Sequence, residues 1–132
     1  MKSVTMKKYL FLTLGLLILS SCAFLSFGSF RSGVQIPAGE EFLLGENTKG
    51  AFEVELDNTC YCDIPVETRD SNGDKTSSFG LASREKVKLT VKSGEYAVLQ
   101  NPYSSVVTVN AIMQEQVYGM RYQALSDSVK VQ

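Results

Sequence analysis

The 132-residue chain contains no histidine and no tryptophan, and only three prolines. Without histidine it lacks both the commonest general base of enzymes and the commonest metal ligand. A nucleophilic serine or cysteine would therefore have no imidazole to take up its proton. Without tryptophan, a sugar-binding surface would have to be built from tyrosine or phenylalanine. The composition gives no support to catalysis, and we expect that the protein is not an enzyme.

The chain has no large excess of charge of either sign, because it contains 13 basic and 14 acidic residues. Three of the lysines, Lys2, Lys7 and Lys8, lie close to the N-terminus. The part of the chain that begins at Cys22 carries 10 basic and 14 acidic residues. Proteins that bind nucleic acid usually gather lysine and arginine on one face, and no such cluster is present here. We expect no nucleic-acid partner.

The first 22 residues have the organisation of an export signal. Basic residues open the chain, and an apolar run follows over positions 9 to 19. The run closes with an aliphatic residue, two small residues and a cysteine, which are Leu19, Ser20, Ser21 and Cys22. This motif resembles the lipobox of bacterial lipoproteins, and the resemblance is limited to these N-terminal positions.

The resemblance implies that residues 1–21 are a signal peptide with a signal helix. It also implies a diacylglyceryl group on the sulfur of Cys22 and a further acyl chain, such as palmitate, on the new amino group. Two or three acyl chains anchor a protein firmly, because each buried methylene contributes about 0.8 kcal/mol. We expect a membrane anchor in the bacterial cell envelope. Ala23, in place of aspartate, favours the outer membrane in a host that follows the enterobacterial sorting rule.

Two other interpretations of this segment stay open. Apolar residues continue beyond Cys22, so that positions 9 to 28 match an uncleaved membrane helix of about 20 residues. Residues 26–28 have the small-x-small form of an ordinary signal-peptidase site, which would release a secreted domain. All three interpretations agree on export. The apolar stretch also predicts that residues 22–38 form a lipidated N-terminus and a short tether that holds the domain close to the bilayer.

Beyond Phe30, apolar and polar residues alternate with a period of two, which is typical of half-buried strands. The clearest case is Phe52, Val54 and Leu56, which alternate with acidic residues. No stretch after the signal has a convincing helical period. We expect strands at residues 41–45, 52–57, 60–68, 86–92, 95–100, 104–114 and 117–124.

Turn residues separate the predicted strands. Asn72-Gly73 is a strong signal for a tight turn, and Ser93-Gly94 suits a two-residue hairpin loop between the strands on either side. Asn101-Pro102 marks another break, because proline cannot donate to a sheet ladder. Short strands with turns at this spacing predict an all-β domain over residues 39–132, a small antiparallel β-sandwich of immunoglobulin-like or jelly-roll-like type. A closed barrel is the alternative.

The sequence repeats itself weakly at an offset of 43 positions. Leu56-x-Asn58 recurs as Leu99-x-Asn101, and apolar residues match in the segments that follow. Each copy would be a strand, an asparagine-containing corner and a second strand in the other sheet. Any two strand-turn-strand units match about as well, so the repeat supports a sandwich without implying a duplicated function.

Cys60-Tyr61-Cys62 is the most distinctive motif after Cys22. Exported compartments are usually oxidising, which favours a disulfide. In a straight strand, however, the β-carbons of residues i and i+2 lie beyond the roughly 3.5–4.5 Å that a disulfide requires. Pairing therefore needs a bend, for which the turn-like residues 57–59 offer a place. Four interpretations stay open: two reduced core cysteines, a disulfide, an intermolecular or redox pair, and a metal site that lacks two of its ligands.

Three further groups are more typical of structure than of function. Residues 70–74 carry oxygen ligands at alternate positions but lack the glycine and glutamate of an EF-hand, so we expect an acidic hairpin tip and no metal site. Glu53 and Glu55 share one strand face without a sign of a pocket. The last group fits sheet packing or an exposed contact patch. It consists of Tyr103, Tyr118, Met120 and Tyr122.

Together these features predict a membrane-anchored lipoprotein of the cell envelope that acts as a non-catalytic binding or assembly module and needs no cofactor. Its partner would be an envelope protein or a glycan. The alternative is a small thiol-redox or metal-handling envelope protein that uses Cys60 and Cys62.

Metabolic labelling with a fatty-acid analogue tests the anchor. We expect the wild-type protein to incorporate the label and the Cys22→Ser variant to stay unlabelled, because serine offers no thiol to the diacylglyceryl group. Equal labelling of the two proteins would contradict the assignment of a lipobox.

Overall fold

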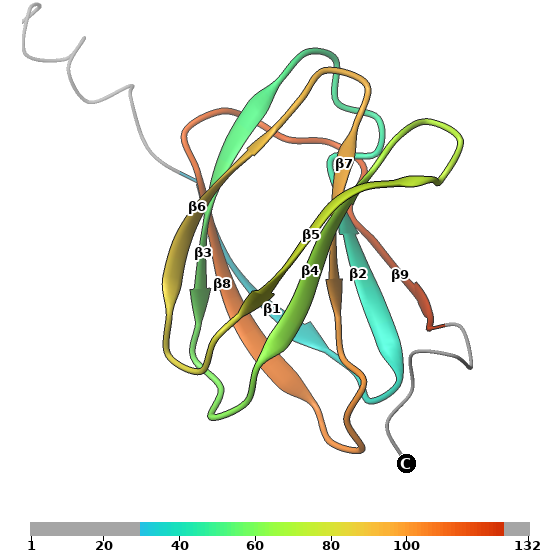
Figure 1. The fold of residues 1–132 in the computed structure, drawn as a ribbon. Coiled ribbons are helices and arrows are strands. Elements are labelled where there is room, and N and C mark those ends of the chain that lie inside the picture. Colours follow the sequence, from blue (N-terminus) through green and yellow to red (C-terminus); the bar gives the residue numbers. More distant parts are fainter. Residues whose placement is uncertain (1–29, 126–132) are drawn as a thin grey trace, which may run out of the picture.

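The computed structural model describes residues 30–125, which form two antiparallel β-sheets packed face to face (Figure 1). The strands are β1 (Phe30–Ile36), β2 (Glu40–Leu44), β3 (Phe52–Asn58), β4 (Ile64–Arg69), β5 (Lys75–Leu81), β6 (Lys86–Val91), β7 (Tyr96–Gln100), β8 (Val107–Met113) and β9 (Arg121–Ala124). The predicted all-β sandwich is confirmed. The expected signal helix and Cys22 lie outside the described residues. Within residues 30–125, no helix is long and apolar enough to cross a membrane.

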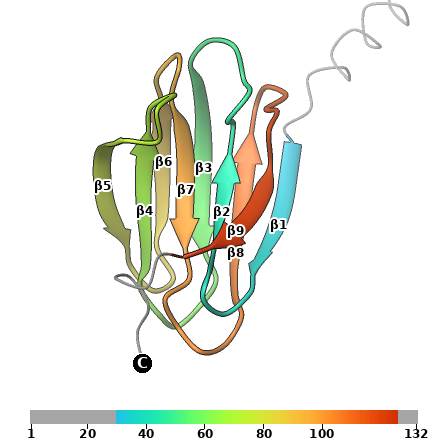
Figure 2. The ribbon, with the colours of Figure 1, turned by 90° about the vertical axis from the view of Figure 1, so that its right-hand side faces the viewer.

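The strand order is that of a jelly roll. One sheet has the order β1-β8-β3-β6 and the other has the order β5-β4-β7-β2-β9. Only the link from β4 to β5 stays within one sheet, and every other link between consecutive strands crosses to the opposite sheet. Eight strands connected in this way make two Greek keys, and β9 is added beside β2. Figure 2 shows the same molecule from the side of β2, β9 and β1.

The core lies between the sheets and is made by the alternation that the sequence displays. Residues Phe52, Val54 and Leu56 of β3 are buried, whereas Glu53 between them is exposed. In β8 the side chains of Val107 and every second residue after it are buried in the same way. Each apolar face therefore turns towards the other sheet, where its burial stabilises the sandwich.

Two strands were not expected. β1 lies in the segment predicted to be a tether, yet it pairs with β8 along its whole length, so the sandwich begins at Phe30 and not at residue 39. β5 was missed because Lys75 and the polar residues after it are largely exposed and show no alternation. Three predicted strands also begin late, at residues 64, 107 and 121, because their first residues form loops.

The two predicted hairpins differ in outcome. Asn72-Gly73 forms the expected tight turn between β4 and β5, where Gly73 has a φ of +84° that favours glycine. The turn at Ser93-Gly94 also forms, since the backbone N–H of Glu95 donates to the carbonyl of Lys92 at 3.0 Å. However, β6 and β7 belong to different sheets, so the predicted hairpin there is wrong. The turn carries the chain across the sandwich.

Asn58 closes β3, and its side chain is fully buried. Its amide nitrogen lies 2.7 Å from the carbonyl oxygen of Cys62, 3.2 Å from that of Leu81 and 3.0 Å from that of Ala82. Its carbonyl oxygen accepts the backbone N–H of Cys60 at 2.9 Å. One side chain thus shapes the corner from β3 to β4 and also holds the end of β5.

Asn101 binds backbone groups in the same way at the corner from β7 to β8. It is fully buried, and its amide donates to the carbonyls of Ile36, Pro37 and Ser105 at 2.8, 3.1 and 2.8 Å. Its carbonyl oxygen accepts the backbone N–H of Tyr103 at 2.9 Å. These partners occupy the same positions relative to Asn101 as the partners of Asn58 do. The weak sequence repeat therefore marks two structurally equivalent corners.

Replacing either asparagine with alanine leaves buried carbonyl groups without donors. We expect Asn58→Ala and Asn101→Ala each to lower the free energy of unfolding by about 3 kcal/mol, measured by urea denaturation. Asn110→Ala, at a partly exposed asparagine of β8, is the matched control and should cost less than about 1 kcal/mol. Losses no larger than that of the control would show that the corners do not depend on these amides.

Candidate functional site

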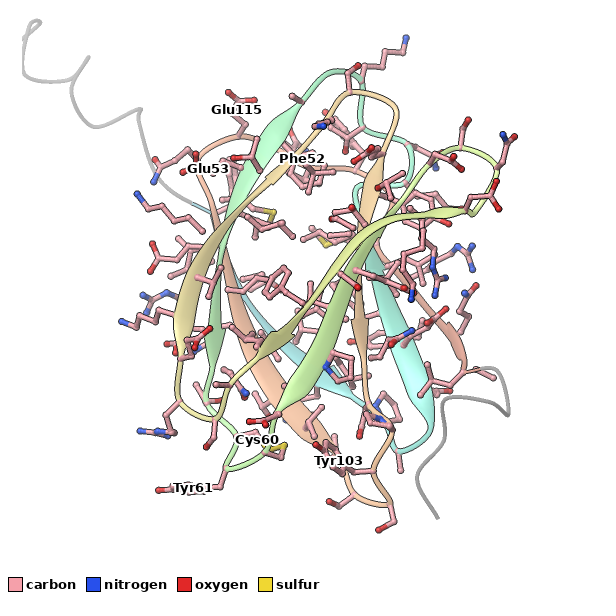
Figure 3. The ribbon with its side chains drawn as sticks, in the orientation of Figure 1. Phe52, Glu53, Cys60, Tyr61, Tyr103 and Glu115 are labelled. Carbon is pink, nitrogen blue, oxygen red and sulfur yellow. A yellow bond between two sulfur atoms is a disulfide. The ribbon has the colours of Figure 1, made fainter. Side chains whose placement is uncertain are left out.

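An open hollow of about 420 Å³ lies between the two asparagine corners. It is lined by Cys60, Tyr61 and Cys62 from the first corner and by Tyr103, Ser104, Ser105 and Val107 from the second. Figure 3 shows Cys60, Tyr61 and Tyr103 together at this end of the sandwich, whereas Phe52, Glu53 and Glu115 lie at the opposite end. The volume falls in the range of about 300–1,000 Å³ that is typical of small-molecule sites.

A disulfide joins Cys60 and Cys62 across a single residue. The two α-carbons are 5.3 Å apart, whereas two steps along an extended strand cover about 6.6 Å. Asn58 produces the required bend, because its side chain binds both the N–H of Cys60 and the carbonyl of Cys62. Of the four interpretations of this pair, the structure contains the disulfide. Both half-cystines are partly buried against the core.

The small disulfide ring projects the side chain of Tyr61 into solvent, where it is 87% exposed. The guanidinium carbon of Arg84 lies 5.4 Å from the centre of the Tyr61 ring, within the distance of a cation–π contact. The same guanidinium donates to the backbone carbonyl of Thr59 at 3.2 Å. Arg84 therefore holds one face of an aromatic ring that makes little contact with the core.

Arg84 has a φ of +63°, and no other residue except glycine among positions 30–125 has a positive φ. The equivalent position at the second corner is Gly39, with a φ of +71°. The backbone around them matches, because Glu85 donates to the carbonyl of Ala82 just as Glu40 donates to that of Pro37. A left-handed conformation costs a non-glycine residue about 1–2 kcal/mol. Such outliers gather at functional sites, so the arginine singles out this corner.

Tyr103 connects the two corners. Its hydroxyl donates to the backbone carbonyl of Asp63 at 2.7 Å, while its backbone is held by Asn101. The carboxylate of Asp63 accepts the N–H of Ser83 at 3.1 Å, and the hydroxyl of Ser83 donates to the carbonyl of Cys60 at 3.1 Å. The walls of the hollow are therefore tied to one another by hydrogen bonds from three loops.

A second polar cluster lies on the five-stranded sheet and includes two buried carboxylates, Glu41 and Glu67. Arg69 binds both oxygens of Glu41 at 2.8 and 2.9 Å and also contacts Glu67, and Gln100 donates to both carboxylates at 3.1 Å. Burial by itself would raise the pKa of Glu41. Hydrogen bonds from Arg69, Gln123 and Gln100 outweigh it and lower that pKa below its usual value. Carboxylates paired with Arg69 in this way bind the strands of the sheet together.

The other sequence candidates fall in separate places. Glu53 is exposed on the outer face of β3, and Glu55 beside it lies opposite Lys88 of β6. Residues 70–74 form the hairpin tip, where Asp70 accepts backbone N–H groups of the turn. Within residues 30–125, no group of three histidine, cysteine, aspartate or glutamate side chains is placed to hold a metal ion.

The late aromatic group does not form one patch. Tyr118 and Met120 are exposed in the loop before β9, whereas the ring of Tyr122 packs on Phe42 with centroids 5.1 Å apart. Tyr103 lies at the other end of β8, in contact with Asp63. Only Tyr103 of this group contributes to the hollow.

Sequence reasoning found the cysteine pair but missed Arg84 and the two serines of the hollow. The available signal was a second repeat, at a different offset. Residues 36–40 and 81–85 share an aliphatic residue at their first position and glutamate at their last. This match places Arg84 opposite Gly39 and would have directed attention to the loop.

No protein-family model matches the chain, and no curated protein matches it. Among solved structures, it is similar to procruciferin, an 11S globulin from Brassica napus, at 13% sequence identity and a TM-score of 0.41. The match covers 78% of this chain and 24% of that chain, so this chain spans about a quarter of the globulin.

Proposed function

We propose that the protein is a lipoprotein anchored through Cys22 to a bacterial envelope membrane, the outer membrane in a host that follows the enterobacterial sorting rule, and that its sandwich is a non-catalytic binding module. The binding site is the hollow between the two asparagine corners. The observation that carries this proposal is the difference between the corners. One has glycine at its left-handed position, whereas the other has Arg84, a disulfide and an aromatic ring displayed to solvent.

The course of β1 supports the placement of the site. Phe30 pairs with Met113 and Ile36 pairs with Val107, so β1 runs from one end of the sandwich to the end that carries the hollow. The chain arrives from Cys22 at the Phe30 end. The hollow therefore lies at the end of the sandwich opposite the one that the chain enters, where an envelope protein or a glycan can reach it.

Anchoring has a physical consequence for binding. A domain confined to a surface meets partners on that surface at a raised effective concentration, so that modest affinity of each copy is sufficient. A shallow, open hollow fits this mode of action.

A thiol-redox function is the second candidate, and the disulfide in the wall of the hollow favours it. In that function, exchange with a partner passes through a mixed disulfide. A Cys60→Ser variant would then trap a partner covalently through Cys62 during non-reducing electrophoresis. A binding module forms no such adduct.

Photo-crosslinking in the native host tests the proposed site. We expect p-benzoyl-phenylalanine in place of Tyr61 to give an adduct with an envelope component on irradiation, and the adduct should withstand reductant. The matched control has the same group in place of Tyr118, which is 56% exposed at the other end of the sandwich and should give no adduct. Adducts from position 118 alone, or from neither position, would refute the assignment.

A further inference from the structure

We propose that the hollow binds an uncharged saccharide, with Tyr61 and Tyr103 as the aromatic contacts and Ser104 and Ser105 as hydrogen-bonding contacts. This inference rests on the proposed function and names the ligand class of the same site. It follows from the charges, the chemistry and the rigidity of the residues that line the hollow.

No side chain that carries a formal charge lines the hollow. Two charged groups in the adjoining loops are already engaged, since Arg84 covers the ring of Tyr61 and binds Thr59, and the carboxylate of Asp63 accepts the N–H of Ser83. A charged ligand would lose its hydration on entering the hollow without gaining a counter-ion. The lining therefore selects an uncharged ligand.

The lining also combines aromatic rings with hydroxyl groups. Tyrosine offers an apolar ring face together with a polar tip, and each serine hydroxyl both donates and accepts a hydrogen bond. A sugar ring presents C–H groups on its faces and hydroxyl groups around its edge, so that it can satisfy both parts of the lining. A purely apolar ligand would gain no hydrogen bond from the exposed hydroxyls of Ser104 and Ser105.

The aromatic contacts are held in place before a ligand arrives. The disulfide and Asn58 fix the backbone on both sides of Tyr61, and Arg84 supports one face of its ring. Tyr103 is fixed by the hydrogen bond from its hydroxyl to Asp63. The backbone on both sides of Tyr61 and the ring of Tyr103 therefore need little ordering on binding, which favours an open site for a weakly held ligand.

The proposal is tested with the full-length, lipidated protein in detergent micelles on an array of neutral and acidic oligosaccharides. The strongest neutral oligosaccharide on the array then serves as the probe for affinity measurements by biolayer interferometry. We expect binding to at least one neutral oligosaccharide, and no acidic oligosaccharide should bind more tightly than the neutral probe.

Variants connect this binding to the hollow. Tyr61→Ala should weaken binding about tenfold, because the lost side chain is the exposed aromatic contact. Arg84→Gly copies the second corner, so it should unfold at an equal or higher urea concentration and yet weaken binding about threefold as Tyr61 loses its support. Tyr118→Ala removes another exposed tyrosine, at the other end of the sandwich, and should leave the affinity unchanged.

Three outcomes overturn the proposal: no neutral oligosaccharide binds, the acidic ones bind more tightly, or Tyr61→Ala binds the neutral probe as well as the wild type does. The crosslinking result separates these failures from failure of the proposed function. If the crosslinker at position 61 gives a protein adduct while no oligosaccharide on the array binds, the proposed ligand class is wrong but the proposed binding site is correct. If both experiments are negative, the site itself is wrong.

Discussion

The buried side-chain amides of Asn58 and Asn101 are the constraint on which the rest of the structure depends. A jelly roll must carry its chain repeatedly from one sheet to the other, and each crossing turns backbone groups away from their ladder partners. Here one asparagine at each of two crossings binds the carbonyl groups of its own corner and of a neighbouring strand end. Without these bonds the carbonyl groups of Leu81 and Ile36 would be buried and unpaired, which is costly.

Because the two corners share these asparagine hydrogen bonds, comparing them separates what the fold requires from what it does not. The bonds common to both serve the fold. The features found at only one corner, namely the disulfide, the exposed ring of Tyr61 and the left-handed Arg84, are not required by the turn itself, since Gly39 makes the same turn without them. A left-handed arginine that supports an exposed aromatic ring adds little to stability. Its place beside that ring fits the binding role that we propose for this corner.

The sequence predicts those parts of the fold in which burial alternates regularly. β3 and β8 have the expected period of two, and the repeat around Asn58 and Asn101 marks the crossings. β1 escapes prediction because its first residues are exposed and include Gly33, so that its pairing with β8 is set by tertiary contact. The disulfide depends on a bend that Asn58 imposes from two residues away, and the conformation of Arg84 depends on hydrogen bonds between loops. The turn-like residues 57–59 and the match of residues 36–40 with 81–85 mark where these features lie, but neither pattern specifies their geometry.

We propose that the lipid on Cys22 is joined to the Phe30 end of the sandwich, whereas the hollow at Tyr61 lies at the other end. Fluorescence energy transfer in proteoliposomes tests it most directly, with a donor dye introduced at position 61 or position 118 and an acceptor on the lipid headgroups. Since a seven-residue strand such as β1 spans about 20 Å, the dye at position 61 should lie farther from the bilayer by roughly that distance and transfer less energy. Equal or greater transfer from position 61 would contradict the account.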